Sequence, residues 1–322
     1  MSKRRTFSNL VDVNVRELEY TDERDFDAYV EKFLTHSSAK NLSKETIKFY
    51  DQKLALWRNT LEELGITTDV TRCDREVIER YVDYFVNERG WKYVSVKTSL
   101  RAVKAFFNFL RNIERVIDRH GFDDFVISGT DKSGIETFSQ SQITRLLSEA
   151  DPKLFTGVRN YTIMLTFLET GVRLRELCDI DIPDVNFTDR VIKILGKNGS
   201  YRYVPFQAKY ANVLRQYLKV RGSSPVDSLF ITHDDTKLSR RAVQQFLSRY
   251  GKKANITDKR VSPHTFRHTF AKMYIQNGGD PFSLQQILGH STMDMVKVYV
   301  NMFGKELDEA HRKFSPLSRI LR

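Results

Sequence analysis

Apolar and polar residues alternate with a helical period through the first third of the chain. Hydrophobic side chains fall on one helical face in each of four segments, FDAYVEKFL, IKFYDQKLALW, REVIERYVDYFVNERG and SVKTSLRAVKAFFNFLRN. Ser43 precedes the second segment and is a residue type that caps helix N-termini, whereas Gly90 ends the third. The pattern therefore predicts an all-helical domain between about residues 21 and 115.

The pattern changes after residue 112, where Gly, Ser and Asp replace the apolar stripe up to about residue 136. Beyond this break, Thr137 or Ser139 is placed to cap a new helix, and RNYTIMLTFLETG is apolar enough to be a buried one. VIKIL and YRYVPF are rich in β-forming residues and flank the turn GKNGS, which predicts a β-hairpin. Helical patterns then return in YANVLRQYLKVRG, RRAVQQFLSRYGKKA, PHTFRHTFAKMYIQNG, FSLQQILG and MDMVKVYV.

These patterns predict a mainly α chain of two domains, with a small antiparallel β-sheet in the second. We place an N-terminal tail at residues 1–22, a helical domain at 23–114, a linker at 115–136, a larger domain at 137–302 and a C-terminal tail at 303–322. The C-terminal tail is amphipathic. It could cover the core of its own chain or dock on a neighbouring protomer.

Charge narrows the class of partner. The 322 residues include 52 Lys and Arg against 41 Asp and Glu, which gives a net charge of +11. Such a balance favours a polyanion, of which nucleic acid is the commonest and an anionic membrane surface the other candidate. No segment approaches the roughly 20 apolar residues that span a bilayer, and no signal peptide begins the chain. Two distant cysteines fit a reducing compartment, so we expect a cytoplasmic protein without a membrane.

Six residues of the second domain suit attack on a phosphodiester. They are Arg173, Lys197, His264, Arg267, His290 and Tyr299. Arginine pairs through its planar fork with phosphate oxygens and stays charged, and a tyrosine phenol can form a covalent phosphodiester. Lysine and histidine can carry protons to and from the bridging oxygens. The set could therefore act without a metal.

Other interpretations of the same motifs are weaker. His264 and His268 lie four residues apart, as zinc ligands on a helix do, but HTFRH has Thr where zinc proteases have Glu. GKNG lacks the GxxxxGK[ST] pattern of a phosphate-binding loop. We therefore expect no metal and no cofactor. His268 is interpreted as a structural or supporting residue, and Arg175 as a surface ion-pair partner.

Basic residues in the last helix of the first domain allow two interpretations. Lys97, Arg101 and Lys104 alternate with short polar residues and could face DNA. They could equally be solvated positions on a core helix. Arg202, in the hairpin, is a further candidate for DNA binding.

The chain resembles the tyrosine recombinases of the phage integrase family, especially their short Xer-like branch. The matching stretches are ETGVRLREL, VIKILGKNGSYRYVPF, SPHTFRHTFA and LQQILGHSTMDMVKVYV. LSKETIKFYDQKL and SVKTSLRAVKAFFNFL are similar to the family's helical, SAM-like core-binding domain. The resemblance runs from about residue 24 to residue 302. It implies site-specific DNA strand exchange through a 3′-phosphotyrosyl intermediate, without metal or ATP.

The resemblance also implies roles for the phosphate-binding residues. Arg173 and Arg267 would grip the scissile phosphate, and His290 would donate a hydrogen bond to it. Glu176 occupies the family's usual acidic position and would support its neighbours.

The remaining roles concern protons and the nucleophile. Tyr299 would be the nucleophile, and His264 would assist proton transfer there. Lys197 would protonate the departing 5′ oxygen. Because the hairpin departs from the common pattern after this lysine, Lys193 is the fallback.

The partner implied by the resemblance is double-stranded DNA with an inverted-repeat core site, bound by a homotetramer. A second recombinase or an accessory protein could share the site. The biological role would be Xer-like resolution or the integration and excision of a mobile element. Two alternatives use the same features: a type IB-like topoisomerase, and a non-catalytic DNA-binding accessory protein.

Overall fold

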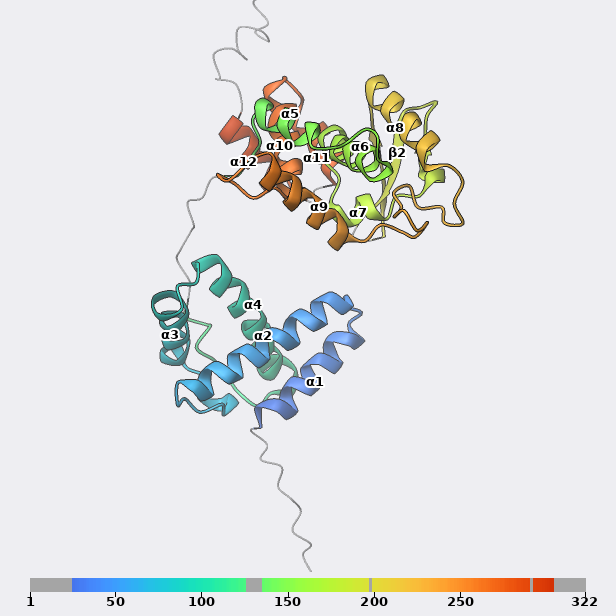
Figure 1. Cartoon of the computed structure of the whole chain (residues 1–322). Coiled ribbons are helices and arrows are strands. Elements are labelled where there is room, and N and C mark those ends of the chain that lie inside the picture. Colours follow the sequence, from blue (N-terminus) through green and yellow to red (C-terminus); the bar gives the residue numbers. More distant parts are fainter. Residues whose placement is uncertain (1–24, 126–134, 197–198, 290–291, 304–322) are drawn as a thin grey trace, which may run out of the picture. The chain divides into compact units, whose positions relative to one another are not determined.

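The computed structural model describes residues 25–125, 135–196, 199–289 and 292–303. The chain divides into two compact units, Met1–Ser133 and Gly134–Arg322, both visible in Figure 1. Each unit is mainly helical, and the second holds a small antiparallel sheet, as the sequence predicts. The tail expected at residues 1–22 lies outside the described residues, as does most of the one expected at 303–322.

The first unit is a helical domain. Its helices are α1 (Phe26–Ala39), α2 (Lys44–Glu63), α3 (Arg75–Asp83) and α4 (Tyr93–Phe109), and α3 and α4 run on into π-helical turns, Tyr84–Glu88 and Leu110–Glu114. The Ser43 hydroxyl accepts a hydrogen bond from the Thr46 backbone N–H, so the predicted cap of α2 is confirmed.

Aromatic side chains fill the core of this first unit. Trp57 of α2 lies 4.7 Å from Tyr81 of α3, and Phe106 of α4 lies 5.7 Å from Phe33 of α1, measured between ring centroids. All four side chains are buried. Burial of each large apolar side chain stabilises the fold by about 1.5–3 kcal/mol relative to exposure. The four predicted helical faces therefore meet in one core.

The second unit contains eight helices and three strands within its described residues. They are α5 (Gln140–Ser148), α6 (Phe155–Thr170), α7 (Leu174–Cys178), β1 (Val185–Asn186), β2 (Val191–Leu195), β3 (Tyr201–Pro205), α8 (Ala208–Arg221), α9 (Arg240–Lys253), α10 (Pro263–Gln276), α11 (Pro281–Leu288) and α12 (Asp294–Phe303). Ser139, one of the two caps that the sequence allows, begins α5 with a capping box.

The predicted hairpin forms between β2 and β3, which pair antiparallel from Val191 opposite Pro205 to Leu195 opposite Tyr201. The two-residue strand β1 pairs with β2 at the edge of the sheet. β1 was not predicted from the sequence, because a strand of two residues is too short to show a period. Side chains alternate along β3, so Tyr201 and Tyr203 are exposed while Val204 is buried.

The buried helix α6 organises the second core, where it packs against α10 and α8. At the end of α6, Gly171 adopts a left-handed conformation with φ 60°. A Cβ atom at this position would also overlap the side chains of Phe270 and Leu288. Glycine thus ends α6 and lets the chain turn tightly into α7 beside α10. This turn carries Arg173 towards Arg267.

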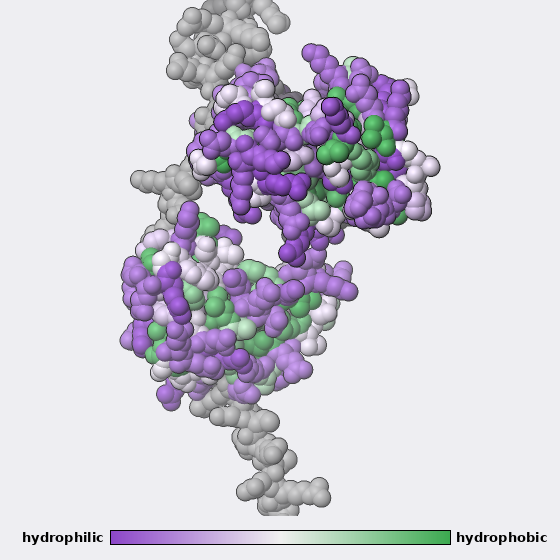
Figure 2. Space-filling view, viewed as in Figure 1, coloured by the Kyte–Doolittle hydropathy of each residue, from purple (hydrophilic) through white to green (hydrophobic). Residues whose placement is uncertain are grey.

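Hydrophilic residues cover most of the visible face of each unit in Figure 2. Of the helices that the structure describes, none combines the length and apolar character needed to cross a membrane.

Candidate active site

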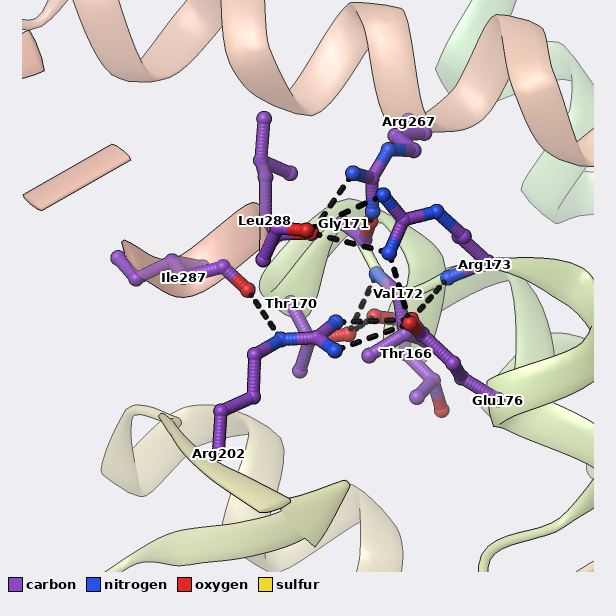
Figure 3. A network of polar contacts seen from close by, with 11 residues as sticks. Thr166, Thr170, Gly171, Val172, Arg173, Glu176, Arg202, Arg267, Ile287 and Leu288 are labelled. Atoms are coloured by element: carbon purple, nitrogen blue, oxygen red, sulfur yellow. Dashed lines mark hydrogen bonds and ion pairs between the residues drawn. The ribbon is translucent and has the colours of Figure 1, made fainter. Parts of the chain in front are cut away.

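The two predicted arginines converge on one backbone oxygen, the carbonyl of Leu288 at the end of α11 (Figure 3). Arg267 Nη2 donates to this carbonyl at 2.8 Å, and Arg173 Nη1 donates to it at 3.3 Å. Arg267 Nη1 also donates to Gly171 O at 2.6 Å, and Arg173 Nη2 donates to Gly289 O at 3.3 Å. The fold therefore brings α6, α7, α10 and α11 together around two guanidinium groups.

Arg267 stays charged although it is buried. Its pKa falls to about 10, because burial penalises the cation and the charge of Arg173 repels it. A guanidinium with this pKa is still protonated near neutral pH. Two adjacent cations in a poorly solvated position favour an anionic ligand.

Glu176 of α7 supplies the negative charge beside the arginines. Its side chain is 5% exposed and accepts from the Arg173 backbone N–H at 2.8 Å and from Arg173 Nη1 at 2.9 Å. Burial alone would raise the pKa of this carboxyl, but the hydrogen bonds and charges of Arg202 and Arg173 lower it to about 2. The carboxylate is therefore ionised and lies beside Arg173, and its supporting role in the reaction stays a prediction.

Arg202, a candidate for DNA binding from the sequence, pairs with the acidic residue of the site. Its Nη1 and Nη2 donate to the two oxygens of Glu176 at 2.9 and 2.7 Å, and its Nε donates to Ile287 O at 2.8 Å. Its side chain is only 15% exposed. The alternation along β3 turns Arg202 inward, on the opposite face from Tyr201 and Tyr203, and its contact with DNA stays a prediction.

The predicted nucleophile contacts a histidine that the sequence analysis ranked as supporting. Tyr299 of α12 is 1% exposed, and its Oη lies 2.7 Å from Nδ1 of His268 on α10. Burial raises the pKa of the Tyr299 phenol, and the positive charge of Arg267 opposes this. Burial and the charges of His264 and Arg267 lower the pKa of His268 below its ordinary value of 6.5. His268 is thus mainly neutral at pH 7 and can accept the phenolic proton.

His264 lies one helical turn before His268 at the start of α10, with ring centroids 6.4 Å apart. Its side chain is exposed, and its pKa is lowered by partial burial and by the charges of Arg267 and Arg173. In the described part of the chain, the histidine that contacts Tyr299 is His268. The assistance of His264 in proton transfer stays a prediction.

Two of the six predicted catalytic residues, Lys197 and His290, lie outside the described residues. The sequence places Lys197 in the turn between β2 and β3, and His290 directly after Gly289. The fallback, Lys193, lies in β2 with its Nζ 4.1 Å from the centroid of the Tyr201 ring.

The other candidates lie outside this site. Arg175 forms the predicted surface ion pair, with Asp179 at 3.7 Å. On α4 of the first unit, Arg101 is exposed, Lys97 is half-buried, and Lys104 Nζ donates to Phe122 O at 3.1 Å. Their contact with DNA stays a prediction. Across residues 25–125, 135–196, 199–289 and 292–303, no group of three or more His, Cys, Asp and Glu side chains could hold a metal ion.

Two guanidinium groups converge on one oxygen in this site, and a tyrosine with its own proton acceptor lies near them. This arrangement suits attack on a phosphodiester. Together with the helical fold and the adjoining hairpin, it defines a tyrosine-type site-specific recombinase.

Comparison with known proteins identifies the family. The chain belongs to the phage integrase family, whose model matches residues 136–306, and the model of the phage integrase N-terminal SAM-like domain matches residues 26–113. The tyrosine recombinase XerD of Staphylococcus epidermidis is 26% identical over 285 residues, which cover 86% of this chain and 94% of XerD. The tyrosine recombinase XerC of Thermodesulfovibrio yellowstonii is 27% identical over 310 residues, with 90% and 97% covered.

Solved structures share the fold. The XerH site-specific recombinase bound to palindromic difH substrate matches with a TM-score of 0.72 at 19% identity, covering 88% of this chain and 83% of XerH. The Tn1549 transposon integrase in complex with transposon right end DNA matches with a TM-score of 0.73 at 20% identity, covering 91% of this chain and 99% of the integrase chain.

Proposed function

We propose that this recombinase cuts DNA through Tyr299 while Arg173 and Arg267 hold the scissile phosphate. The observation that carries the proposal is the convergence of both guanidinium groups on the carbonyl of Leu288. Because one oxygen acceptor already lies within hydrogen-bonding reach of both guanidinium groups, the two groups can bind one phosphate together. They would exchange their backbone acceptors for non-bridging oxygens when DNA binds.

The chemistry balances as a transesterification. Oη of Tyr299 attacks the phosphorus, the bond from phosphorus to the 5′ oxygen breaks, and a 3′-phosphotyrosyl bond forms. The phenolic proton passes to Nδ1 of His268, which lies 2.7 Å from Oη. Lys197 returns a proton to the departing 5′ oxygen, and His290 donates a hydrogen bond to the phosphate, as the family resemblance implies. The covalent bond conserves energy for resealing, so the reaction needs no ATP.

Tyr299 must become accessible before it can react, because its side chain is 1% exposed. We propose that α12 shifts when the protein assembles on DNA, far enough to expose the phenol but with Oη of Tyr299 still in reach of Nδ1 of His268. The C-terminal tail follows α12 directly and would couple this movement to a neighbouring protomer. That tail lies outside the described residues.

The substrate that we propose is a duplex with an inverted-repeat core site, bound by four copies of the chain. The net charge of +11 supports a polyanionic partner. The structure of XerH, which shares the fold, holds a palindromic site. Xer-like resolution and mobile-element transfer both fit this chemistry.

Trapping of the covalent intermediate tests the proposed function. The substrate would be a DNA sequence that the wild-type chain selects from a random duplex pool. A nick placed close to the cleavage position releases the short fragment that carries the 5′ hydroxyl after cleavage, so that resealing is prevented. We expect a protein–DNA adduct that survives SDS and forms equally well in EDTA. Absence of the adduct, or its loss in EDTA, would contradict the proposal. Relaxation of plasmids that lack the selected site, without four-way junctions, would indicate the topoisomerase alternative.

The contact between His268 and Tyr299 gives a second prediction. In His268→Asn the amide oxygen can still accept a hydrogen bond but cannot take up the proton, so we expect adduct formation to slow by about 100-fold. The pKa of His268 lies below 6.5, so the wild-type rate should fall as the pH drops through that pKa and the base becomes protonated. His268→Asn should lack this acidic limb. Single-turnover rates between pH 5 and 8 measure both effects.

The matched control is His264→Asn, which changes the histidine one turn away without touching Tyr299. It should leave the acidic limb of the pH profile in place. Faster adduct formation by His268→Asn would instead mean that His268 only retains Tyr299 in its buried position, and would exclude the proton-transfer role.

A further inference from the structure

Arg202 joins three elements that surround the candidate site. It extends from β3, binds both carboxylate oxygens of Glu176 on α7, and donates to Ile287 O in the last turn of α11 (Figure 3). From this geometry we infer that Arg202 is a positioning residue: by neutralising Glu176 it leaves Arg173 able to bind the scissile phosphate. The inference rests on the proposed function of Arg173.

The buried carboxylate of Glu176 needs a counter-charge. Glu176 is ionised and 5% exposed, so its charge must be compensated by neighbouring cations. Two arginine side chains contact it. Arg202 spans both oxygens with its fork, whereas the Arg173 side chain reaches Oε1 through Nη1 alone. Arg202 therefore carries the main ion pair, and its geometry is the bidentate one that arginine forms best with a carboxylate.

Arg173 keeps N–H groups that a phosphate could bind. Its side chain is 38% exposed, and within the described residues its two other side-chain hydrogen bonds are to Leu288 O and Gly289 O at 3.3 Å. These long bonds to neutral carbonyls can be exchanged for bonds to a phosphate at little cost. Without Arg202, the buried carboxylate would draw Arg173 into a bidentate pair. That pair would occupy the N–H groups that the phosphate needs.

Arg202 also contacts the end of α11. Nε of Arg202 donates to Ile287 O at 2.8 Å, and Leu288 and Gly289 follow directly. Gly289 has φ +62°, and a Cβ atom there would lie 3.0–3.1 Å from the Arg202 guanidinium and Cδ. Arg202 thus packs closely against the turn whose carbonyls accept from both catalytic arginines. The same side chain orders the hairpin, the acidic residue and this turn.

Three variants test the inference: Arg202→Gln, Arg202→Lys and the double variant Glu176→Gln with Arg202→Gln. We expect Arg202→Gln to form the Tyr299 adduct about 100-fold more slowly, with DNA affinity within about threefold of wild type. Lysine has one nitrogen and cannot span both oxygens, so Arg202→Lys should be about tenfold slower. The double variant should be at least about tenfold faster than Arg202→Gln, because a neutral amide in place of the Glu176 carboxylate has no charge with which to capture Arg173.

This recovery separates positioning from mere stabilisation when each rate is expressed per folded molecule, which thermal unfolding of each variant measures. Glu176→Gln also removes the uncompensated buried charge and can restore stability, so a residue that only held the fold together would recover folded protein without a change in the rate per folded molecule. A wild-type rate in Arg202→Lys, or a double variant no faster than Arg202→Gln, would overturn the inference. If Arg202→Gln does not fold, the rate of the double variant is compared with that of Arg202→Lys instead. The double variant can be used in this way because it lacks the uncompensated charge of the Glu176 carboxylate. Equal or slower adduct formation by the double variant would then overturn the inference.

Crystal structures of the DNA-free variants decide the inference independently of the reaction. In Arg202→Gln or Arg202→Lys, Arg173 should rotate into a bidentate pair with Glu176. An Arg173 side chain that stays on Leu288 O and Gly289 O in both would overturn the inference. Absence of any adduct from the wild-type chain would refute the proposed function instead, and this structural result would still stand.

Discussion

Tyr299→Phe is expected to abolish the covalent adduct completely while leaving DNA affinity unchanged. The substitution removes one oxygen, the nucleophile, and the phenyl ring that remains has no atom that can attack phosphorus. The ring lies in a cluster with Phe270, Leu288 and Val296, so phenylalanine should fill the same space and keep α12 in place. The lost hydrogen bond to His268 should cost about 1 kcal/mol of folding stability. SDS gels of the trapping reaction and equilibrium DNA binding measure the two properties separately.

Tyr274→Phe is the matched control. Tyr274 packs against the same cluster, and its hydroxyl pairs with Ser283 at 2.8 Å rather than with a catalytic residue. It should form adduct at a rate close to wild type. Persistence of the adduct in Tyr299→Phe would refute the assignment of the nucleophile. Loss of DNA binding along with the adduct would indicate that the variant had lost its fold.

Sequence periodicity predicted the helices and the hairpin well because each depends on neighbouring residues. Ser43 and Ser139 mark helix starts through local hydrogen bonds, and both caps are present. The strand pair β2 and β3 follows from β-forming runs around a short turn. In contrast, β1 has two residues and pairs only because β2 offers an edge.

The contacts of the site were harder to predict because they join distant segments. His268 and Tyr299 are 31 residues apart, and Arg202 and Glu176 are 26 apart. The alternation in YRYVP is a local signal that Arg202 points inward, but it does not identify Glu176 as the partner. The carbonyl of Leu288 carries no sequence signal at all, because every residue has one.

Arg267→Lys is expected to slow adduct formation by about 1,000-fold or more. The fork of Arg267 reaches Gly171 O and Leu288 O with separate nitrogens, and this geometry is what would grip two oxygens of a phosphate. Lysine offers a single nitrogen, so it can supply charge but not the paired hydrogen bonds. Single-turnover trapping at saturating protein concentration measures the chemical step. DNA affinity should change by less than about tenfold, because other cations of this basic chain would supply most of the contacts to the DNA backbone.

The pH dependence of Arg267→Lys follows from burial. The same surroundings hold the pKa of arginine down to about 10, and lysine begins from a lower ordinary pKa, so the buried lysine should lose part of its charge near neutral pH. Its charged form is favoured at lower pH. The rate of the variant relative to wild type should therefore rise as the pH falls from 9 to 6.

Arg175→Lys is the control, because Arg175 is exposed and pairs only loosely with Asp179, and its rate should stay within about twofold of wild type. A rate for Arg267→Lys within tenfold of wild type at every pH would show that Arg267 contributes charge alone. It would refute the proposal that Arg267 donates paired hydrogen bonds to two phosphate oxygens.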